Sequence, residues 1–237
     1  MPYAIVQQKD AFSNSATTIA TGNFSSNPTT GNLIYVVAAG FTAATAFNTP
    51  TDTRGNTYVS LGNATEVGTG TFLYHWYAKN ISGGAVNSVS VTSTGTATVI
   101  GIAAVEISGL DTISPFDVQS IQGAQVGSSG ANAMTSGSAT NTVQPAAIVG
   151  FQIDLQGAVE AAGTSPIAFT GLTPVWNNFG GSGVNNGLFE HARLTTTGSV
   201  AATFQDTGFD RYCACMAVFK EATASAFTSR LLTLGVG

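Results

Sequence analysis

The sequence predicts an all-β fold, an antiparallel two-sheet sandwich over residues 1–220 followed by a C-terminal arm over residues 221–237. Sustained 3.6-residue periodicity of apolar residues, the mark of amphipathic helices, is nearly missing. Runs of β-branched and aromatic residues bounded by Gly, Asn and Ser recur throughout the chain. The 237 residues are enough for one large β domain with a substantial core.

Ten strands are expected from these runs. They cover residues 3–8, 32–41, 57–62, 71–79, 87–93, 97–107, 146–155, 187–195, 199–205 and 211–220. Turn residues separate them, and short strands spaced by such turns are typical of antiparallel sandwiches and barrels.

Four stretches within these strands carry apolar residues on both faces, at 32–41, 99–107, 146–153 and 213–219. A strand with one face in water alternates apolar with polar residues. We therefore expect these four strands to be central. Their outward faces would be covered by a loop, a neighbouring layer of strands or a second subunit. The low-charge stretch 118–145 is a candidate for part of that cover.

The two halves of the chain are weakly similar to each other. Leu33 and Leu73 are 40 residues apart, and so are Ile148 and Leu188. Each half has an apolar strand, a long excursion, an aromatic strand, a Gly-containing turn and two further strands. Two related Greek-key halves of this kind fit a jelly roll. The alternative is that β-proteins alternate alike and that no repeat exists.

The order of several segments carries a resemblance to a known family. The segments are GNLIYVVAAGF (31–41), TDTRGNTYVSLG (51–62), LYHWYAKNISGGAVNSVSVTSTG (73–95), VEISGLDTISPFDV (105–118) and ACMAVFK (214–220). Together they resemble a jelly-roll module with the concanavalin A-like sandwich shape, as found in tailed-phage virion proteins and bacterial surface proteins. The resemblance covers about residues 20–220 and implies a fold more than a function.

Charge and composition narrow the function classes. Only 8% of the residues are charged, compared with about 25% in an average globular protein. The net charge of −5 and the absence of Lys or Arg clusters argue against nucleic acid as a partner. No apolar stretch reaches the length of a membrane span, and the first residues do not resemble a signal peptide. We expect synthesis in a host cytoplasm.

No catalytic residue is expected. Glycosidases on such sandwiches need two carboxylates at a fixed separation, whereas Glu106, Asp154 and Glu190 each stand alone in the sequence. His75 and His191 fall near matching places in the two halves, but no convincing third ligand accompanies them. The sequence therefore predicts a protein that is not an enzyme and has neither a metal site nor a cofactor.

Asp52 and Asn56 suit a tight turn in which Gly55 supplies a positive φ. Calcium binding is the alternative there, although only two oxygen-bearing side chains are visible. Cys213 and Cys215 point to the same face of a strand, a geometry that suits a disulfide poorly. They are expected as small buried thiols in a reducing compartment.

The strand FLYHWY is the best candidate for contact with a glycan. Its alternation places Phe72, Tyr74 and Trp76 on one face, and His75 and Tyr77 on the other. Tyr74, Trp76 and Tyr77 are the candidate glycan-binding residues, since aromatic faces stack on sugar rings. The alternative is that these rings belong to the core.

The end of the chain is unusual for a terminus, because five large apolar side chains follow a small-residue spacer. Ordering the seventeen residues 221–237 costs more conformational entropy than burial of these side chains returns. Such an arm would become ordered only where it also gains backbone hydrogen bonds, as when it adds a strand to a neighbour's sheet. The expected partner-binding residues are Phe227, Arg230, Leu231, Leu232, Leu234 and Val236.

The leading functional hypothesis is a non-enzymatic structural protein of a phage virion, namely a capsid decoration (cement) protein anchored through its arm. Its partners would be the major capsid protein or another virion protein, and it would form homo-oligomers. The alternative is a glycan- or receptor-binding module of a tail fibre or spike. Neither hypothesis involves nucleic acid, a membrane or a cofactor.

Overall fold

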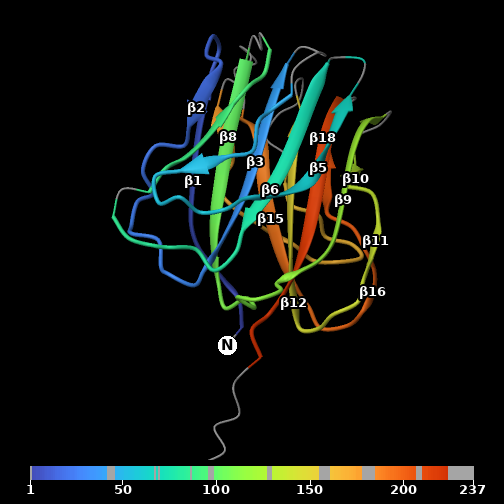
Figure 1. The fold of residues 1–237 in the computed structure, drawn as a ribbon. Helices are drawn as coiled ribbons and strands as arrows, with labels where there is room; N and C mark the ends of the chain where they lie inside the picture. Colours follow the sequence, from blue (N-terminus) through green and yellow to red (C-terminus); the bar gives the residue numbers. More distant parts are fainter. Residues whose placement is uncertain are drawn as a thin grey trace, which may run out of the picture.

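The computed structural model describes residues 2–41, 46–66, 68, 70–85, 87–95, 99–126, 130–154, 161–177, 185–206 and 210–223. Every strand pair in it is antiparallel, and the described residues form no helix (Figure 1). The described part of the chain therefore holds no helix able to cross a membrane. The predicted all-β sandwich is confirmed.

The first half of the chain builds a large sheet, with the strand order β1-β8-β3-β6-β5, and a small outer layer, with the order β2-β7-β4. The strands are β1 (Ala4–Ser13), β2 (Thr18–Ala20), β3 (Leu33–Phe41), β4 (Thr51–Asp52), β5 (Val59–Glu66), β6 (Thr71–Ala78), β7 (Val89–Thr92) and β8 (Val99–Ser108). The chain alternates between the two sheets from β1 to β4 and again from β6 to β8. This alternation is that of a jelly roll.

The second half repeats the plan. Its large sheet has the order β13-β15-β12-β18-β9, with β14 also paired to β15, and its outer layer consists of the ladders β10-β17 and β11-β16. The strands are β9 (Phe116–Val126), β10 (Gly130–Thr135), β11 (Ala139–Asn141), β12 (Ala146–Asp154), β13 (Thr170–Gly171), β14 (Val175–Asn177), β15 (Asn185–Leu194), β16 (Gly198–Val200), β17 (Thr203–Asp206) and β18 (Asp210–Lys220).

The two large sheets have corresponding strand orders. From one edge to the other, β1, β8, β3, β6 and β5 correspond to β9, β18, β12, β15 and the β13/β14 pair. The sequence similarity between the halves thus has a counterpart in topology, but its arrangement differs from the expected one. Each half completes its own large sheet and its own outer layer, instead of supplying one Greek key to a single two-sheet jelly roll.

The sequence match between the halves is displaced by one residue. Leu33 faces the opposite large sheet, whereas Ile148 faces an outer layer; its neighbours Ala147 and Val149 are the residues that face as Leu33 does. A shift of one residue exchanges the two faces of a strand.

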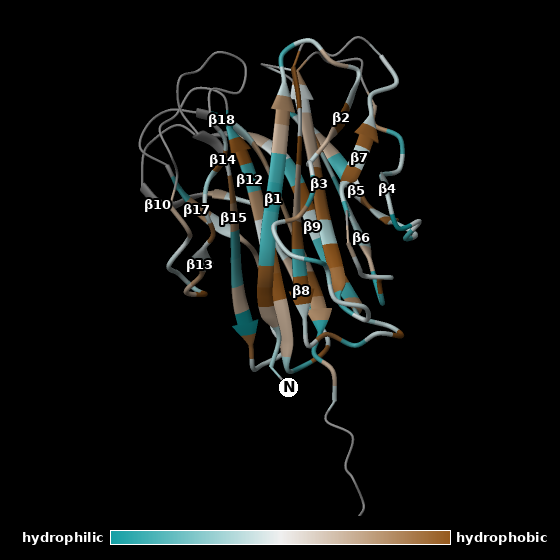
Figure 2. Ribbon diagram, turned by 90° about the vertical axis from the view of Figure 1, so that its left-hand side faces the viewer, coloured by the Kyte–Doolittle hydropathy of each residue, from teal (hydrophilic) through white to brown (hydrophobic). Residues whose placement is uncertain are grey.

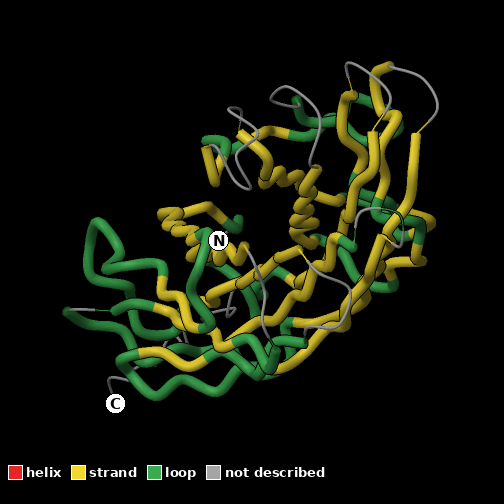
Figure 3. Tube along the Cα trace, turned by 90° about the horizontal axis from the view of Figure 1, so that it is seen from above, coloured by secondary structure: helices red, strands yellow, loops and turns green. Residues whose placement is uncertain are grey.

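Four layers result, and Figure 3 looks down the strands of the large sheets. We call the apolar layer between the two large sheets the central core; it includes Tyr35, Val37, Val105, Phe151, Phe189, Cys215 and Phe219. The first outer core, between the first large sheet and its outer layer, includes Ile34, Val36, Trp76, Val91 and Ile102. The second outer core includes Met134, Ile148, Leu188, Phe204 and Met216.

The layers explain the strands that are apolar on both faces. β3, β8, β12 and β18 each place one face in the central core and the other in an outer core. Of the predicted covers, a neighbouring layer of strands is the one observed. The 118–145 stretch supplies part of it through β10 and β11, while β9 is an edge strand of the sheet itself. Edge strand β1, by contrast, carries the polar run 7–10, teal in Figure 2.

The two halves also meet at both edges of the central core. β5 lies against β9, and β1 lies against β14. Since β1 corresponds to β9 and β5 to the β13/β14 pair, exchanging the halves exchanges these two contacts. Arg211 Nη1 and Glu66 Oε1, 2.8 Å apart, join the halves at the first edge. At the second edge, Trp176 Nε1 donates a hydrogen bond to the Ile102 carbonyl at 3.1 Å.

The start of β1 and the end of β18 lie at the same end of the sandwich, the lower end in Figures 1 and 2. Backbone contacts continue beyond the expected end of the sandwich at Lys220. The Glu221 amide donates to the Pro145 carbonyl at 3.1 Å, and the Ala222 amide donates to the Gly109 carbonyl at 2.9 Å. The arm residues named from the sequence, Phe227, Arg230, Leu231, Leu232, Leu234 and Val236, lie outside the described residues.

Candidate functional site

The buried carboxylate of Glu106 holds a loop in place. It accepts hydrogen bonds from Gln7 Nε2 at 2.5 Å, from the Thr29 amide at 2.8 Å and from Asn32 Nδ2 at 2.6 Å. These donors come from β1 and from the segment that precedes β3. Each carboxylate oxygen is therefore used to tie neighbouring segments to β8.

Glu190, on β15, performs a similar task in the second half. Its two oxygens accept the Gly163 amide at 3.0 Å and the Thr203 amide at 3.1 Å. Burial raises the pKa of the Glu190 carboxyl to about 8, against the lowering effect of these two amides. Asp154 is also buried, at the end of β12 opposite Tyr212. The three carboxylates stand alone in the sequence, and in the structure Glu106 and Glu190 accept hydrogen bonds from neighbouring segments of the fold.

The two histidines differ in burial, although Nδ1 of each lies close to a tyrosine hydroxyl. His75 is fully buried between the two large sheets, beside the central core. Its Nδ1 is 2.9 Å from the Tyr35 hydroxyl, and that hydroxyl is 3.3 Å from Cys215 Sγ. Desolvation lowers the pKa of His75 to about 3, although Gln119 and the Leu61 backbone act in the opposite direction. This contact joins β3 and β6 of the first half to β18 of the second.

His191 is only partly buried, and its Nδ1 lies 2.8 Å from the Tyr3 hydroxyl. Desolvation lowers its pKa as well. The two histidines lie on corresponding strands, β6 and β15, opposite Val37 and Val149 respectively. Among the described residues, no three His, Cys, Asp or Glu side chains come together as a metal site would require.

Cys213 and Cys215 are buried free thiols on β18, as the sequence predicted. Both side chains point into the central core. Burial raises the pKa of each thiol to about 12, so neither is a thiolate at neutral pH.

The aromatic strand β6 divides its rings between two cores. Trp76 is 2% exposed in the first outer core, and Tyr77 is 7% exposed in the central core. Tyr74 is less buried and stacks on Trp76 with ring centroids 5.7 Å apart. Two of the three candidate glycan-binding residues therefore lie in the interior and form no open aromatic platform.

The 51–56 segment forms the expected tight turn. Asp52 Oδ1 accepts the amides of Arg54 and Asn56, while Oδ2 accepts Asn56 Nδ2 and the Tyr58 hydroxyl. Gly55 has a φ of +72°. Donors of the protein itself thus occupy both Asp52 oxygens. This arrangement is that of a tight turn and not of a calcium-binding loop.

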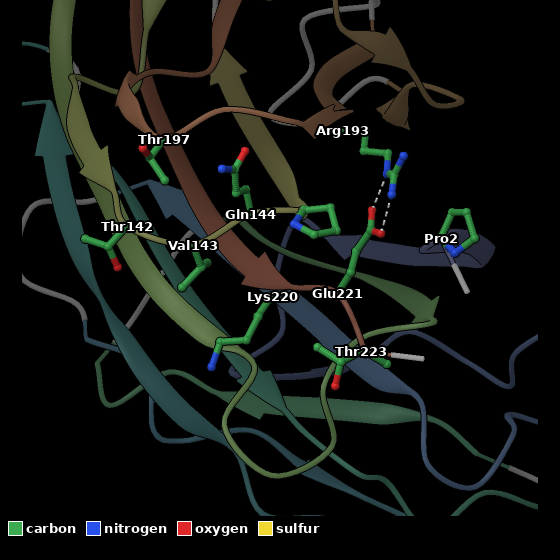
Figure 4. Close-up of a pocket in the computed structure, with 11 residues that line it drawn as sticks. Pro2, Thr142, Val143, Gln144, Arg193, Thr197, Lys220, Glu221 and Thr223 are labelled. Carbon is green, nitrogen blue, oxygen red and sulfur yellow. Dashed lines mark hydrogen bonds and ion pairs between the residues drawn. The ribbon is translucent and has the colours of Figure 1, made fainter. Parts of the chain in front are cut away.

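A cavity of about 630 Å³ opens at the end of the sandwich where the described chain begins and ends. We call it the end cavity (Figure 4). Its walls come from residue 2, from residues 142–145 between β11 and β12, from Arg193 on β15, and from residues 220–223 at and beyond the end of β18, with Thr197 at one side. Sequence reasoning missed it because no local pattern links these segments.

An ion pair forms one wall of the end cavity. Arg193 Nε and Nη2 donate to the two Glu221 oxygens at 2.6 and 2.8 Å, and Figure 4 shows this pair beside Pro2. The Glu221 side chain is 2% exposed, whereas that of Arg193 is 45% exposed. The bond to Glu221 raises the pKa of the Arg193 guanidinium. The pair anchors the end of β18 to β15.

The other residues that line the end cavity are mostly apolar or uncharged, which suits the binding of a ligand or peptide. Pro2, Val143, Pro145 and Ala222 provide apolar surface, and threonine hydroxyls and Lys220 surround it. Tyr3 lies next to this wall; burial and, secondarily, the Glu221 charge raise its pKa to about 12, so its hydroxyl is not a base at neutral pH. A cavity of this size and composition fits a partly apolar ligand or peptide.

No protein-family model, curated protein or solved structure matches the chain.

Proposed function

We propose that this chain is a non-enzymatic structural protein of a phage virion, a capsid decoration protein that attaches through its C-terminal segment. The virion assignment comes from the resemblance of residues 20–220 to jelly-roll modules and from the low charge. The observation that carries the attachment is the anchored end of β18. Its ion pair and backbone bonds hold the chain as far as Ala222, five residues before Phe227, the first of the large apolar residues in 227–236.

Two features of the described residues support a structural role. The carboxylates of Glu106 and Glu190 accept hydrogen bonds that stabilise the fold, and their partners are backbone amides and amide side chains. The four layers form two jelly-roll halves that share the central core. Burial of Trp76 and Tyr77 makes the glycan-binding alternative the weaker one.

The first test is whether the chain belongs to particles. Phage particles from cells that carry the coding sequence would be banded in a density gradient, and their proteins identified by mass spectrometry. The chain should band with the major capsid protein in near-stoichiometric amount. Its presence only in the particle-free fraction would contradict the virion assignment.

The second test concerns attachment. Particles stripped of the chain would be incubated with the full chain or with a variant that ends at Thr223. This boundary keeps Glu221 and Ala222, which the fold uses. The full chain should rebind and the truncated variant should not, while both keep the same circular dichroism spectrum. Equal rebinding would show that attachment lies elsewhere.

A further inference from the structure

The end cavity presents apolar surface to solvent. Pro2, Val143, Pro145 and Ala222 surround a space of about 630 Å³, and none of these four residues is fully buried. Apolar surface gathered in a hollow is a usual place for another polypeptide to dock.

The chain itself contains a segment of matching character. The fourteen residues 224–237 include five large apolar side chains and a single charge, Arg230. They follow Thr223, which lines the end cavity. Fully extended, fourteen residues span up to about 46–50 Å, which is far enough to reach a neighbouring molecule.

The segment that fills the cavity can come from the same chain or from a second copy. To fill its own cavity, the chain would have to reverse direction directly after Thr223, within residues 224–226. Those residues are Ala-Ser-Ala, of which only Ser225 is a turn-favouring type, and its hydroxyl acts more weakly than an Asn or Asp side chain. A segment from a second copy enters without that reversal. Because each copy has the same cavity and the same segment, a two-fold pair satisfies both at once.

We infer that the end cavity is the receptor for residues 224–237 of a second copy of this chain, so that two copies exchange their C-terminal segments. The inference rests on the proposed function, in which this segment is the docking element. It adds that the segment is first held by a sister copy.

Single-cysteine variants test this directly. One variant carries Thr197→Cys on the exposed wall of the cavity, and the other carries Ser229→Cys within the segment, which keeps all five apolar side chains. The two proteins are mixed and treated with a short bismaleimide. The native thiols of Cys213 and Cys215 are buried and do not compete. The matched control replaces Thr197→Cys by Ser15→Cys, an exposed position beyond the opposite end of β1.

We expect a cross-linked heterodimer of the two variants, at least tenfold more abundant than with the Ser15→Cys control. Excess peptide of residues 224–237 should abolish it, and the variant that ends at Thr223 should be monomeric in light scattering where the full chain is dimeric. Cross-linking only within a chain that carries both Thr197→Cys and Ser229→Cys would assign the cavity to the chain's own segment and overturn the inference. No cross-link in either arrangement would also overturn it.

The outcome separates this inference from the proposed function. If cross-linking fails while the full chain rebinds stripped particles and the truncated variant does not, segment exchange is wrong and the decoration role stands. If the heterodimer forms but the chain never bands with particles, segment exchange stands and the decoration role is wrong.

Discussion

Burial, against the effect of the hydrogen-bond partners, sets the protonation state of two titratable side chains in this protein, Glu190 and His75. Glu190 sits under the outer layer of the second half, where burial favours the neutral acid. His75 lies between the two large sheets, where burial favours the neutral imidazole. Both groups therefore couple the stability of the fold to pH, with opposite signs.

The signs follow from which state binds more protons. Glu190 keeps its proton to about pH 8 when folded but loses it near pH 4.5 when unfolded, so its contribution to stability falls as pH rises between those values. His75 gains a proton near pH 6.5 when unfolded but only near pH 3 when folded, so its contribution falls as pH drops through that window. The two effects oppose each other between about pH 4.5 and 6.5.

Thermal unfolding should therefore show a broad maximum near pH 4.5–6.5 and a decline of several degrees from pH 6.5 to 8. Glu190→Gln should flatten this decline, because an amide does not titrate. It should also lower the melting temperature at pH 6, since its NH₂ group would face one of two backbone amides that donate to Glu190. A decline from pH 6.5 to 8 that persists unchanged in Glu190→Gln would assign it to another group.

A second residue-scale prediction concerns the Arg193–Glu221 pair. Arg193→Leu leaves a carboxylate whose side chain is 2% exposed without its guanidinium partner. We expect a lower melting temperature and faster hydrogen exchange at the amides of Glu221 and Ala222. The double variant Arg193→Leu/Glu221→Leu should lose less unfolding free energy than the sum of the losses in the two single variants. Additive effects would mean that the pair does not hold the end of β18.

At the scale of elements, the close approach of β5 to β9 depends on a residue without a side chain. A Cβ at Gly123 would lie 2.6 Å from the backbone of Thr65 and Glu66. Backbone atoms cannot move aside as a flexible side chain can. The absence of a side chain at this position therefore lets an edge of the second large sheet close onto an edge of the first.

Gly123→Ala should destabilise the protein by about 1–3 kcal/mol, the usual cost of overpacking. Denaturant unfolding followed by fluorescence would measure this. Gly171→Ala is the matched control, because a Cβ there meets its nearest atom at 3.4 Å on the edge strand β13. Equal stability of Gly123→Ala and the native protein would mean that the β5–β9 contact is looser than described.

At the scale of the whole molecule, the central core makes the two halves depend on each other. Phe189 of the second half packs against Phe151 at a centroid distance of 4.6 Å and against Tyr35 of the first half at 6.2 Å. Neither large sheet could bury this face alone. The halves should therefore unfold together, although each has its own outer core.

Calorimetry should accordingly show one unfolding transition. Phe189→Ala should lower the unfolding free energy by about 3–5 kcal/mol and move the whole transition without splitting it. Ile113→Ala, at a side chain that is 80% exposed, should leave the transition in place. Two separate transitions, with only one sensitive to Phe189→Ala, would show that the halves are independent domains.

Local pattern was sufficient for most of the strands. The stretches 32–41, 71–79, 146–155 and 211–220 match β3, β6, β12 and β18 to within a residue at each end, because strong β-type patterns and bounding turns are legible over a few residues. Strand β9 was missed because its polar, glycine-containing sequence looks like a loop until β18 pairs with it. The short strands β2, β4 and β13 exist only through their partners.

The sequence by itself determined the fold class, the central position of the strands that are apolar on both faces, and the buried state of the two cysteines. These properties depend on which residues share a face, and a period of two is visible in one chain. Only the tertiary structure decided that each half forms its own sheet and outer layer, that His75 is fully buried and His191 only partly, and that residue 2, residues 142–145 and residues 220–223 enclose one cavity. Each of these outcomes depends on what lies opposite a face or beside a strand end. Such neighbours come from positions far away along the chain, and no local periodicity records them.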